Sequence, residues 1–127
     1  MAHRSRLAGF IIDCNTGDHA GAADFWSQAL GFPTGEHEIE GNAEYTALTD
    51  APANLYVAVQ TVDHASRVHL DIEADDQDAE AARLEALGAK RIGWVKRWWV
   101  MEAPTGQRFC VVKMKEQGKG ETPNDWD

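Results

Sequence analysis

The sequence predicts an α+β domain in which two βαβββ modules form a cup-shaped antiparallel sheet. Two helical segments, DHAGAADFWSQALG from residue 18 and DDQDAEAARLEALG from residue 75, have the same length and lie 57 residues apart. An apolar strand-like run precedes each segment, and three shorter strand-like pieces follow it. A chain of 127 residues can bury one core of this kind but not two ordinary domains. Helices on one side of such sheets leave the other side open, which predicts a cup.

The first module is expected over residues 7–62. LAGFIIDC, residues 7–14, is a short apolar run and predicts a buried strand. Asp18 is placed to cap a helix that runs to Leu30, and Gly31 is the expected C-cap. The helix carries an apolar stripe made of Ala22, Phe25, Trp26, Ala29 and Leu30. Three further strands are expected in EHEIEG, AEYTALTD and NLYVAVQTV.

The second module, residues 67–114, repeats this plan. RVHLDIEA predicts its first strand, Asp75 is expected to open the helix, and Gly88 to end it. AKRIGWV, RWWVMEA and QRFCVVKM predict the remaining strands. Together the modules form one domain over residues 7–114, and the polar residues 115–127 are expected to be a flexible tail, which Trp126 either docks or extends into a crystal or subunit contact.

Composition excludes several classes of protein. The chain is 43% hydrophobic and 26% charged, as in soluble proteins, and has no apolar run near the roughly 18 residues that cross a membrane. A formal charge of −9 repels phosphate backbones and argues against nucleic acid as a partner. The apolar run LAGFII is too short to be the apolar segment of a secretory signal, because Asp13 and then polar residues follow it. The two cysteines form no CxxC pair, which favours a reducing cytoplasm.

Three segments carry a resemblance to a known family: AADFWSQALGF, VHLDIEADD followed by EAARLEALGA, and VMEAPTGQRFCVV. Residues 7 to about 114 resemble the vicinal oxygen chelate superfamily, which includes glyoxalase I, bleomycin-resistance proteins and extradiol dioxygenases. The chain looks most similar to the small glyoxalase-like branch. This resemblance implies a cup whose floor receives one residue from each of four strands.

Metal-binding members of the family hold a divalent ion at those four positions. Carried over by the resemblance, the positions fall on Ile11, Gln60, His69 and Cys110. Isoleucine cannot bind a metal, and Gln60 offers only a neutral amide oxygen, so no metal cofactor is favoured. A shift of two residues in the first strand would bring Asp13 to the first position instead. The alternative is a site for Zn, Ni, Fe or Mn built from donors placed differently.

His69 is the candidate catalytic acid or base, because only histidine titrates unperturbed near neutral pH. It is either a ligand-pocket residue or a core histidine satisfied by a neighbour. Asp71 lies on the same strand face and would orient the ring. Of Trp98 and Trp99, alternation turns one toward the pocket or core and the other away. The expected ligand-pocket residues are Ile11, Asp13, Gln60, His69, Trp98, Trp99 and Cys110.

Two functions of different class follow from the sequence and the resemblance. The first is a protein that binds a small organic molecule in the cup without the family metal, either as a drug- or metabolite-binding protein or as a metal-independent enzyme. The second is a metal-dependent lyase or isomerase of the glyoxalase type, or a dioxygenase. In either case a homodimer is expected, with a small-molecule ligand or substrate and with neither nucleic acid nor membrane as partner.

Overall fold

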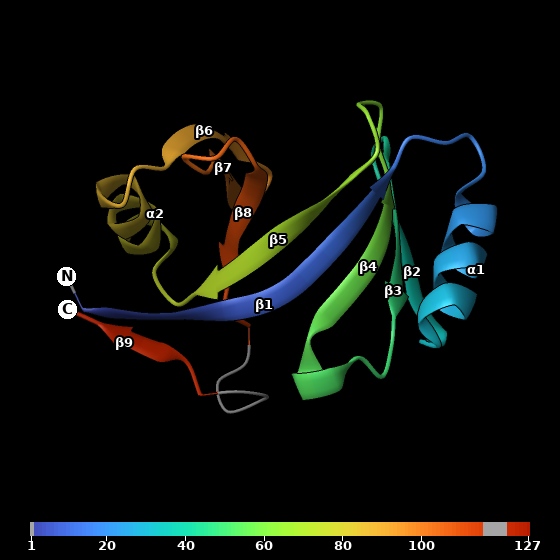
Figure 1. Cartoon of the computed structure of the whole chain (residues 1–127), viewed down its shortest axis with the longest axis horizontal. Coiled ribbons are helices and arrows are strands. Elements are labelled where there is room, and N and C mark those ends of the chain that lie inside the picture. The colour runs from blue at the N-terminus through green and yellow to red at the C-terminus, as the bar shows by residue number, and fades with distance from the viewer. Residues whose placement is uncertain (1, 116–121) are drawn as a thin grey trace. The chain divides into compact units, whose positions relative to one another are not determined.

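The computed structural model describes residues 2–115 and 122–127, which divide into two compact units. Unit 1 consists of residues 1–8 and 69–127, and unit 2 of residues 9–68. Each unit combines one helix with strands of a mixed sheet, so the expected α+β class with two strand–helix–three-strand modules is confirmed (Figure 1). No helix among the described residues has the length and hydropathy of a membrane span.

Unit 2 contains the end of β1 (His3–Cys14), α1 (His19–Leu30), β2 (Thr34–Glu40), β3 (Ala43–Leu48) and β4 (Tyr56–Thr61). The strand order is β2, β3, β4, β1. The helix starts and ends where expected: the carboxylate of Asp18 accepts from the Gly21 amide, and Gly31 closes it at φ 74°, a conformation that glycine adopts without strain.

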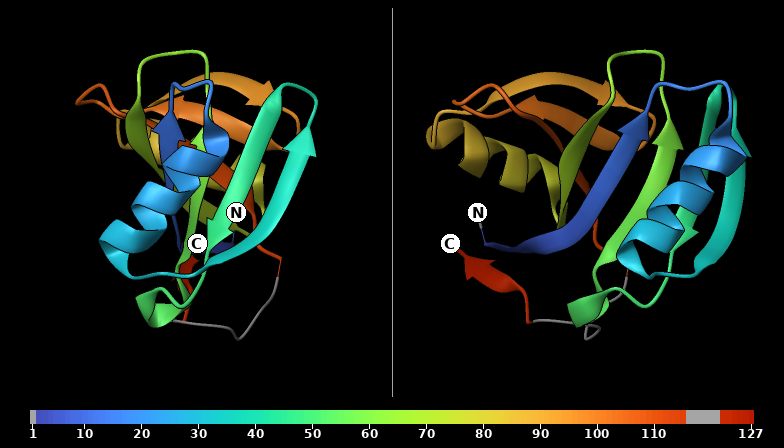
Figure 2. Two further views of the ribbon diagram at one scale, coloured as in Figure 1. Left: turned by 90° about the vertical axis from the view of Figure 1, so that its right-hand side faces the viewer. Right: turned by 45° about the vertical axis from the view of Figure 1, so that its right-hand side comes forward.

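The core of unit 2 lies between α1 and one face of these strands (Figure 2). Its buried residues are Ile12, Cys14, Leu48, Val57 and Val59. Trp26 of α1 packs against them, as the apolar stripe predicts. The opposite face carries the alternate residues of each strand and does not contain this core.

Unit 1 contains the start of β1, β5 (Arg67–Ala74, from His69 onward), α2 (Gln77–Ala86), β6 (Lys90–Val95), β7 (Trp98–Glu102), β8 (Arg108–Lys113) and β9 (Asn124–Trp126). The strand order is β5, β8, β7, β6, and β9 pairs with β1. The buried core lies on the α2 side and consists of Ala74, Ala81, Met101 and Val111.

The sheets are not wholly antiparallel. β1 pairs with β4, and β5 with β8, in parallel. The reason is the connection through the helix, which returns the chain to the same edge and runs the next strand parallel to the first. Two reversals later, the fourth strand of each module is parallel to the first strand and pairs with it.

Two helix details differ from the sequence prediction. The N-cap of α2 is Asp76, whose side chain accepts from the Ala79 amide, and not Asp75. Asp75 instead accepts from the backbone amide of Arg4 at 2.8 Å. The C-cap is Leu87, one residue before Gly88, which has a φ of 109°. With two aspartates in succession, the tertiary contact to Arg4 decides which one caps.

Both ends of the chain form strands beyond the predicted elements, and the alternative in which Trp126 docks the tail is confirmed. β1 begins at His3 rather than Leu7, and the end of the expected flexible tail forms β9, beside the start of β1 in Figure 1. Residues 116–121 of that tail lie outside the described residues. The Trp126 indole donates to the hydroxyl of Ser5 at 2.8 Å, which anchors β9.

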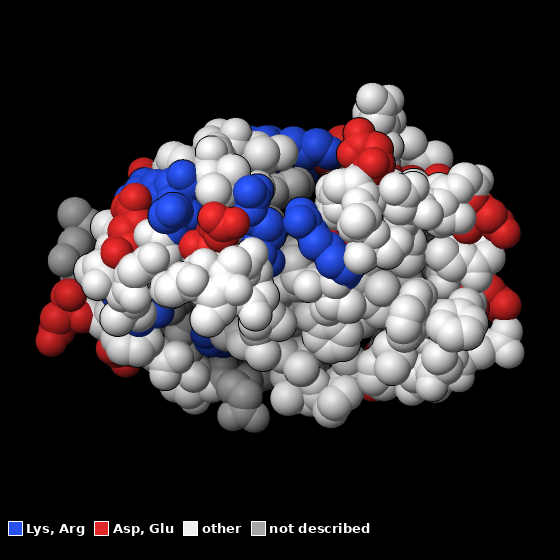
Figure 3. Space-filling model, turned by 45° about the horizontal axis from the view of Figure 1, so that its top comes forward, with Lys and Arg blue, Asp and Glu red and all other residues white. Residues whose placement is uncertain are grey.

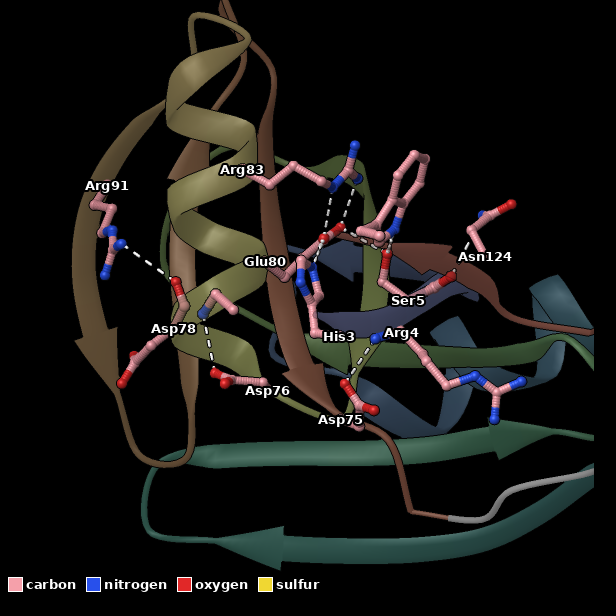
Figure 4. A network of polar contacts seen from close by, with 12 residues as sticks. His3, Arg4, Ser5, Asp75, Asp76, Asp78, Glu80, Arg83, Arg91 and Asn124 are labelled. Carbon is pink, nitrogen blue, oxygen red and sulfur yellow. Dashed lines mark hydrogen bonds and ion pairs between the residues drawn. The ribbon is translucent and has the colours of Figure 1, made fainter. Parts of the chain in front are cut away.

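A buried carboxylate connects these terminal strands to α2 (Figure 4). Glu80 is 0% exposed and accepts from His3, Ser5 and Arg83 at 2.7 to 2.9 Å. The Arg83 guanidinium also lies 3.9 Å from the centroid of the Trp126 ring. Burying a carboxylate is tolerated only when donors compensate its lost hydration, and here four hydrogen bonds do so.

Candidate functional site

The open face of unit 2 carries three of the expected pocket residues. Strand register places Ile11 beside Ala58, and Asp13 beside Gln60. The Gln60 amide donates to the Tyr45 hydroxyl at 3.3 Å across the β3–β4 pair. These side chains alternate with the core residues, so they lie on the face that α1 does not cover. Tyr45 was not among the expected residues, because its place depends on the register of β3.

Gly9 lies where β1 and β4 approach each other most closely. A Cβ at this position would lie 1.8 Å from the carbonyl oxygen of Tyr56, its partner on β4. Only glycine lets the two backbones approach so closely. The approach in turn aligns Ile11 and Asp13 with β4.

Asp13 is the buried acid of this face, at 2% exposed. The Nε atom of Arg67 lies 3.8 Å from its Oδ2 atom. The arginine side chain is 45% exposed, so the pair joins a buried carboxylate to a cation that reaches solvent. Ile11, at 6% exposed, offers no donor atom to a metal.

The open face of unit 1 brings His69, Asp71 and Cys110 together. His69 and Asp71 are alternate residues of β5, and Asp71 pairs with Cys110 of β8 in register. The Nε2 atom of His69 lies 3.4 Å from Oδ1 of Asp71, and both side chains are 13–14% exposed. The sequence predicted the His69–Asp71 pair from strand alternation, but the third member depends on the parallel register of β5 and β8.

The adjacent tryptophans lie on opposite faces. Val100 pairs with Cys110, so Trp98, two residues earlier, lies on the His69 face. Trp99 lies on the α2 side, where it packs against the core and donates from its indole to Asp78 at 2.8 Å. Trp98 therefore remains a candidate pocket residue, whereas Trp99 is placed with the core.

The donors on the open face of unit 1 fit a divalent metal better than the four family positions alone suggest. One ligand atom each from His69, Asp71 and Cys110 lies within 4.8 Å of the others. The Oδ1 atom of Asp71 is buried, and its 3.4 Å contact with His69 Nε2 is an ion-pair contact rather than a hydrogen bond. Three protein donors of the N, O and S types are what a catalytic zinc site uses. Asp71 supplies the donor that sequence reasoning assigned only to orienting His69.

A second cluster was not expected from the sequence. His19, His37 and Glu44 also bring ligand atoms within 4.8 Å of one another, on the α1 side of unit 2. They come from three elements, and only the pairing of β2 with β3 makes His37 and Glu44 neighbours. Nothing in the spacing of these residues along the chain signals the cluster.

Charge is divided unevenly between the units. Unit 2 contains nine acidic residues and one basic residue, a formal charge of −8, whereas unit 1 contains twelve acidic and eleven basic residues, a charge of −1. Figure 3 shows Lys and Arg side chains gathered on part of the surface drawn. Unit 2 is thus the more acidic part of the chain and the part better suited to a cation, whereas the charges of unit 1 nearly cancel.

Comparisons with known proteins agree on the fold. A family model described as "Glyoxalase-like domain" matches residues 9–112. A search of curated proteins finds no match. The methylmalonyl-CoA epimerase of Mycobacterium tuberculosis is similar in structure with a TM-score of 0.63 at 15% identity, covering 87% of this chain and 88% of that chain.

Two further solved structures are similar. A hypothetical protein from Bacillus halodurans C-125 has a TM-score of 0.67 at 11% identity, covering 91% of this chain and 99% of that chain. A variant of the Streptomyces coelicolor methylmalonyl-CoA epimerase, in complex with 2-nitronate-propionyl-CoA, has a TM-score of 0.62 at 16% identity, covering 87% of this chain and 98% of that chain. At these identities the likeness concerns the fold alone.

Proposed function

Since the chain belongs to the glyoxalase-like domain family of the vicinal oxygen chelate superfamily, we propose that it binds a small organic molecule on the open face of unit 1. We further propose that His69 exchanges a proton with this molecule and that the family metal is not needed. The observation that carries the proposal is the His69–Asp71 pair, 3.4 Å apart on the sheet face opposite α2, where both side chains are partly buried. The resemblance supports a metal-free site, because its first two ligand positions hold Ile11 and Gln60.

The chemistry of the pair suits proton transfer. A carboxylate beside an imidazole holds the ring in one orientation and stabilises the imidazolium that forms when the ring accepts a proton. Trp98 adds a broad aromatic surface on the same face, and a few polar groups beside such a surface are what a small-molecule site needs. Asp71 is the positioning residue, and His69 is the group that meets the ligand.

The ligand class is proposed from the cations near this face. Unit 1 holds eleven of the twelve Lys and Arg residues, together with twelve of the 21 acidic residues. On this face Arg108 lies 3.5 Å from Glu102, and the Lys96 ammonium lies 5.9 Å from the centroid of the Trp98 ring. We therefore propose an anionic carbonyl compound, such as a carboxylate or an acyl thioester, as the ligand.

Binding can be tested with defined probes. Titrations of methylmalonyl-CoA and 2-nitronate-propionyl-CoA, and a screen of carboxylate fragments by NMR, would be run on the wild-type chain, His69→Ala and His69→Gln. His64→Ala is the matched control, since that ring lies on an exposed loop. We expect probes to bind and both His69 variants to weaken binding by roughly tenfold, the loss of about one hydrogen bond to a charged group.

The outcomes separate the alternatives. If no probe binds, or if every probe binds the His69 variants as tightly as the wild-type chain, the proposed site is overturned. A loss of several kcal/mol of stability in His69→Ala, with probe binding unchanged, would show instead that the histidine is structural. Proton exchange itself is read from deuterium uptake by a bound carbonyl probe in D₂O, which the His69 variants should abolish and His64→Ala should preserve.

A metal-dependent lyase or isomerase is the second candidate, favoured by the three donors within 4.8 Å. His69, Asp71 and Cys110 would hold the ion, which would polarise a substrate oxygen. Metal analysis of protein purified without chelator distinguishes the two functions. A stoichiometric ion that is lost in Cys110→Ala and His69→Ala would favour this candidate over the first.

A homodimer in the cytoplasm remains part of the proposal. Cys14 and Cys110 are both free thiols, which agrees with a reducing compartment.

Large apolar side chains are exposed, including Phe25 at 61%, Ile39 at 69% and Leu87 at 67%. Such surface is often covered by a partner subunit. Light scattering should give twice the chain mass of 14.0 kDa, and a monomer would contradict the dimer.

A further inference from the structure

The cluster of His19, His37 and Glu44 lies on the α1 side of unit 2, away from the open face that holds Ile11 and Gln60. His19 is the first residue of α1, His37 lies on β2, and Glu44 on β3. One ligand atom from each lies within 4.8 Å of the others. The cluster plays no part in the function proposed for unit 1.

Strand register creates the cluster. His37 pairs with Thr46 across β2 and β3, and Glu44 pairs with Thr61 across β3 and β4. Glu44 and Thr46 are alternate residues of β3, so all four side chains belong to one sheet face. The Asp18 cap begins α1 at His19, directly above that face.

His19 is held firmly. Its Nδ1 atom lies 2.7 Å from the Thr61 hydroxyl and its Nε2 atom 2.8 Å from the Thr46 hydroxyl. The residue is 8% exposed. Burial lowers the pKa of His19, and the neighbouring His37 lowers it further, against the opposing charge of Glu44. A neutral imidazole is the form that coordinates metals.

His37 and Glu44 complete the donor set from the solvent side. The His37 Nε2 atom lies 2.6 Å from a Glu44 carboxylate oxygen, and the His19 and His37 rings are 5.5 Å apart between centroids. The side chains of His37 and Glu44 are 48% and 33% exposed, so an ion can reach them. The formal charge of −8 on unit 2 attracts a cation to this surface.

We propose that His19, His37 and Glu44 bind a divalent transition-metal ion, and that zinc is the ion best suited to them. Two imidazoles and one carboxylate are a zinc ligand set that leaves a position for water. One ring nitrogen of His19 would bind the ion in place of its threonine hydroxyl. The other ring nitrogen would keep its threonine partner, which holds the ring in orientation, as hydrogen-bond partners of metal-binding histidines do. The ion would tie α1 to the hairpin of β2 and β3, whose β2 residues are all exposed.

The test keeps this site apart from His69, Asp71 and Cys110. The zinc measurements use the full chain with Cys110→Ala, treated with chelator and then dialysed. Zinc chloride is titrated by calorimetry and thermal unfolding into this background, with His37→Ala, with Glu44→Gln, and with His64→Ala as the control. Circular dichroism checks that each variant is folded.

We expect one zinc ion to bind the background protein and to raise its unfolding midpoint. His37→Ala should weaken zinc binding by more than roughly tenfold, because even the loss of a residue that only hydrogen-bonds to a metal ligand lowers metal affinity by about that much. Glu44→Gln should also weaken zinc binding. His64→Ala should change neither reading. No zinc binding in the Cys110→Ala background, or binding that survives both ligand variants, would overturn the proposal.

Cobalt gives an independent reading. Cobalt bound to His19, His37 and Glu44 has no sulfur ligand, whereas cobalt at Cys110 would show a sulfur-to-metal charge-transfer band. The chain with Cys110 intact should therefore retain cobalt d–d absorption that His37→Ala removes. A spectrum in which all cobalt absorption depends on Cys110 would contradict the site.

Discussion

Replacing Glu80 with glutamine is the sharpest test of how unit 1 holds its terminal strands. Glu80 is fully buried and accepts four hydrogen bonds, two of them from Arg83. Glutamine keeps the shape but removes the charge and turns an NH₂ group toward these donors. Breaking a buried ion pair by removing one partner costs about 3 to 5 kcal/mol. Because the Arg83 side chain is 26% exposed and can regain water, we expect about 3 kcal/mol.

The assay is urea unfolding followed by tryptophan fluorescence, which gives the midpoint and the slope. Glu85→Gln is the matched control, since Glu85 lies on the same helix and pairs with Arg91 at 2.8 Å near the surface. An exposed pair is worth only about 0 to 1 kcal/mol. A loss in Glu80→Gln no larger than that in Glu85→Gln would refute the reasoning.

Acid should remove the difference between Glu80→Gln and the wild type. Burial opposes the charged form, but hydrogen bonds from Arg83, His3 and Ser5 outweigh it and hold the pKa of Glu80 below its ordinary value of 4.5. A group whose pKa is lower in the folded state stabilises the fold above its unfolded pKa and loses that contribution as pH falls through the folded value. The two proteins should therefore begin to converge in stability as pH falls below 4.5 and should become equal only below the folded pKa of Glu80; a constant difference down to strong acid would contradict the assignment.

Three further outcomes follow from single side chains. Trp126→Ala should cost about 2 kcal/mol, because it removes a half-buried ring and its bond to Ser5; unfolding unchanged in urea would show that β9 is not anchored this way. Burial lowers the pKa of His19, so the metal-free chain should lose stability as pH falls below 6.5, where the unfolded state takes up the proton first; His19→Gln should lessen that loss in unfolding measured across pH. Burial and the adjacent Asp13 raise the pKa of the Cys14 thiol, so alkylation followed by mass spectrometry should label Cys110 well before Cys14 in the native chain.

Local patterns predicted much of the fold. The cap at Asp18 and the left-handed Gly31 were confirmed because each depends on a few neighbouring residues. Alternation along β5 correctly placed His69 and Asp71 on one face. The choice between Asp75 and Asp76 as the cap of α2 failed, because the distant Arg4 amide takes Asp75.

The candidate sites required long-range pairing. Cys110 joins His69 and Asp71 through the parallel register of β5 with β8, and the faces of Trp98 and Trp99 follow from the register of β7 with β8. Alternation predicted that the two tryptophans would point apart but did not decide which one faces α2. The register between strands distant in sequence depends on which faces the helices cover, and no short segment contains that information.

By itself the sequence determined the two repeated modules, the position of α1 with its caps, and the pairing of His69 with Asp71, because these depend on periods of two and 3.6 residues within one segment. Only the tertiary structure decided that Asp71 lies beside Cys110, that β9 returns to Ser5, and that His19 meets His37 and Glu44. These contacts join segments that are separate in the chain, and hydrogen-bond register and core packing fix them only when the whole unit folds.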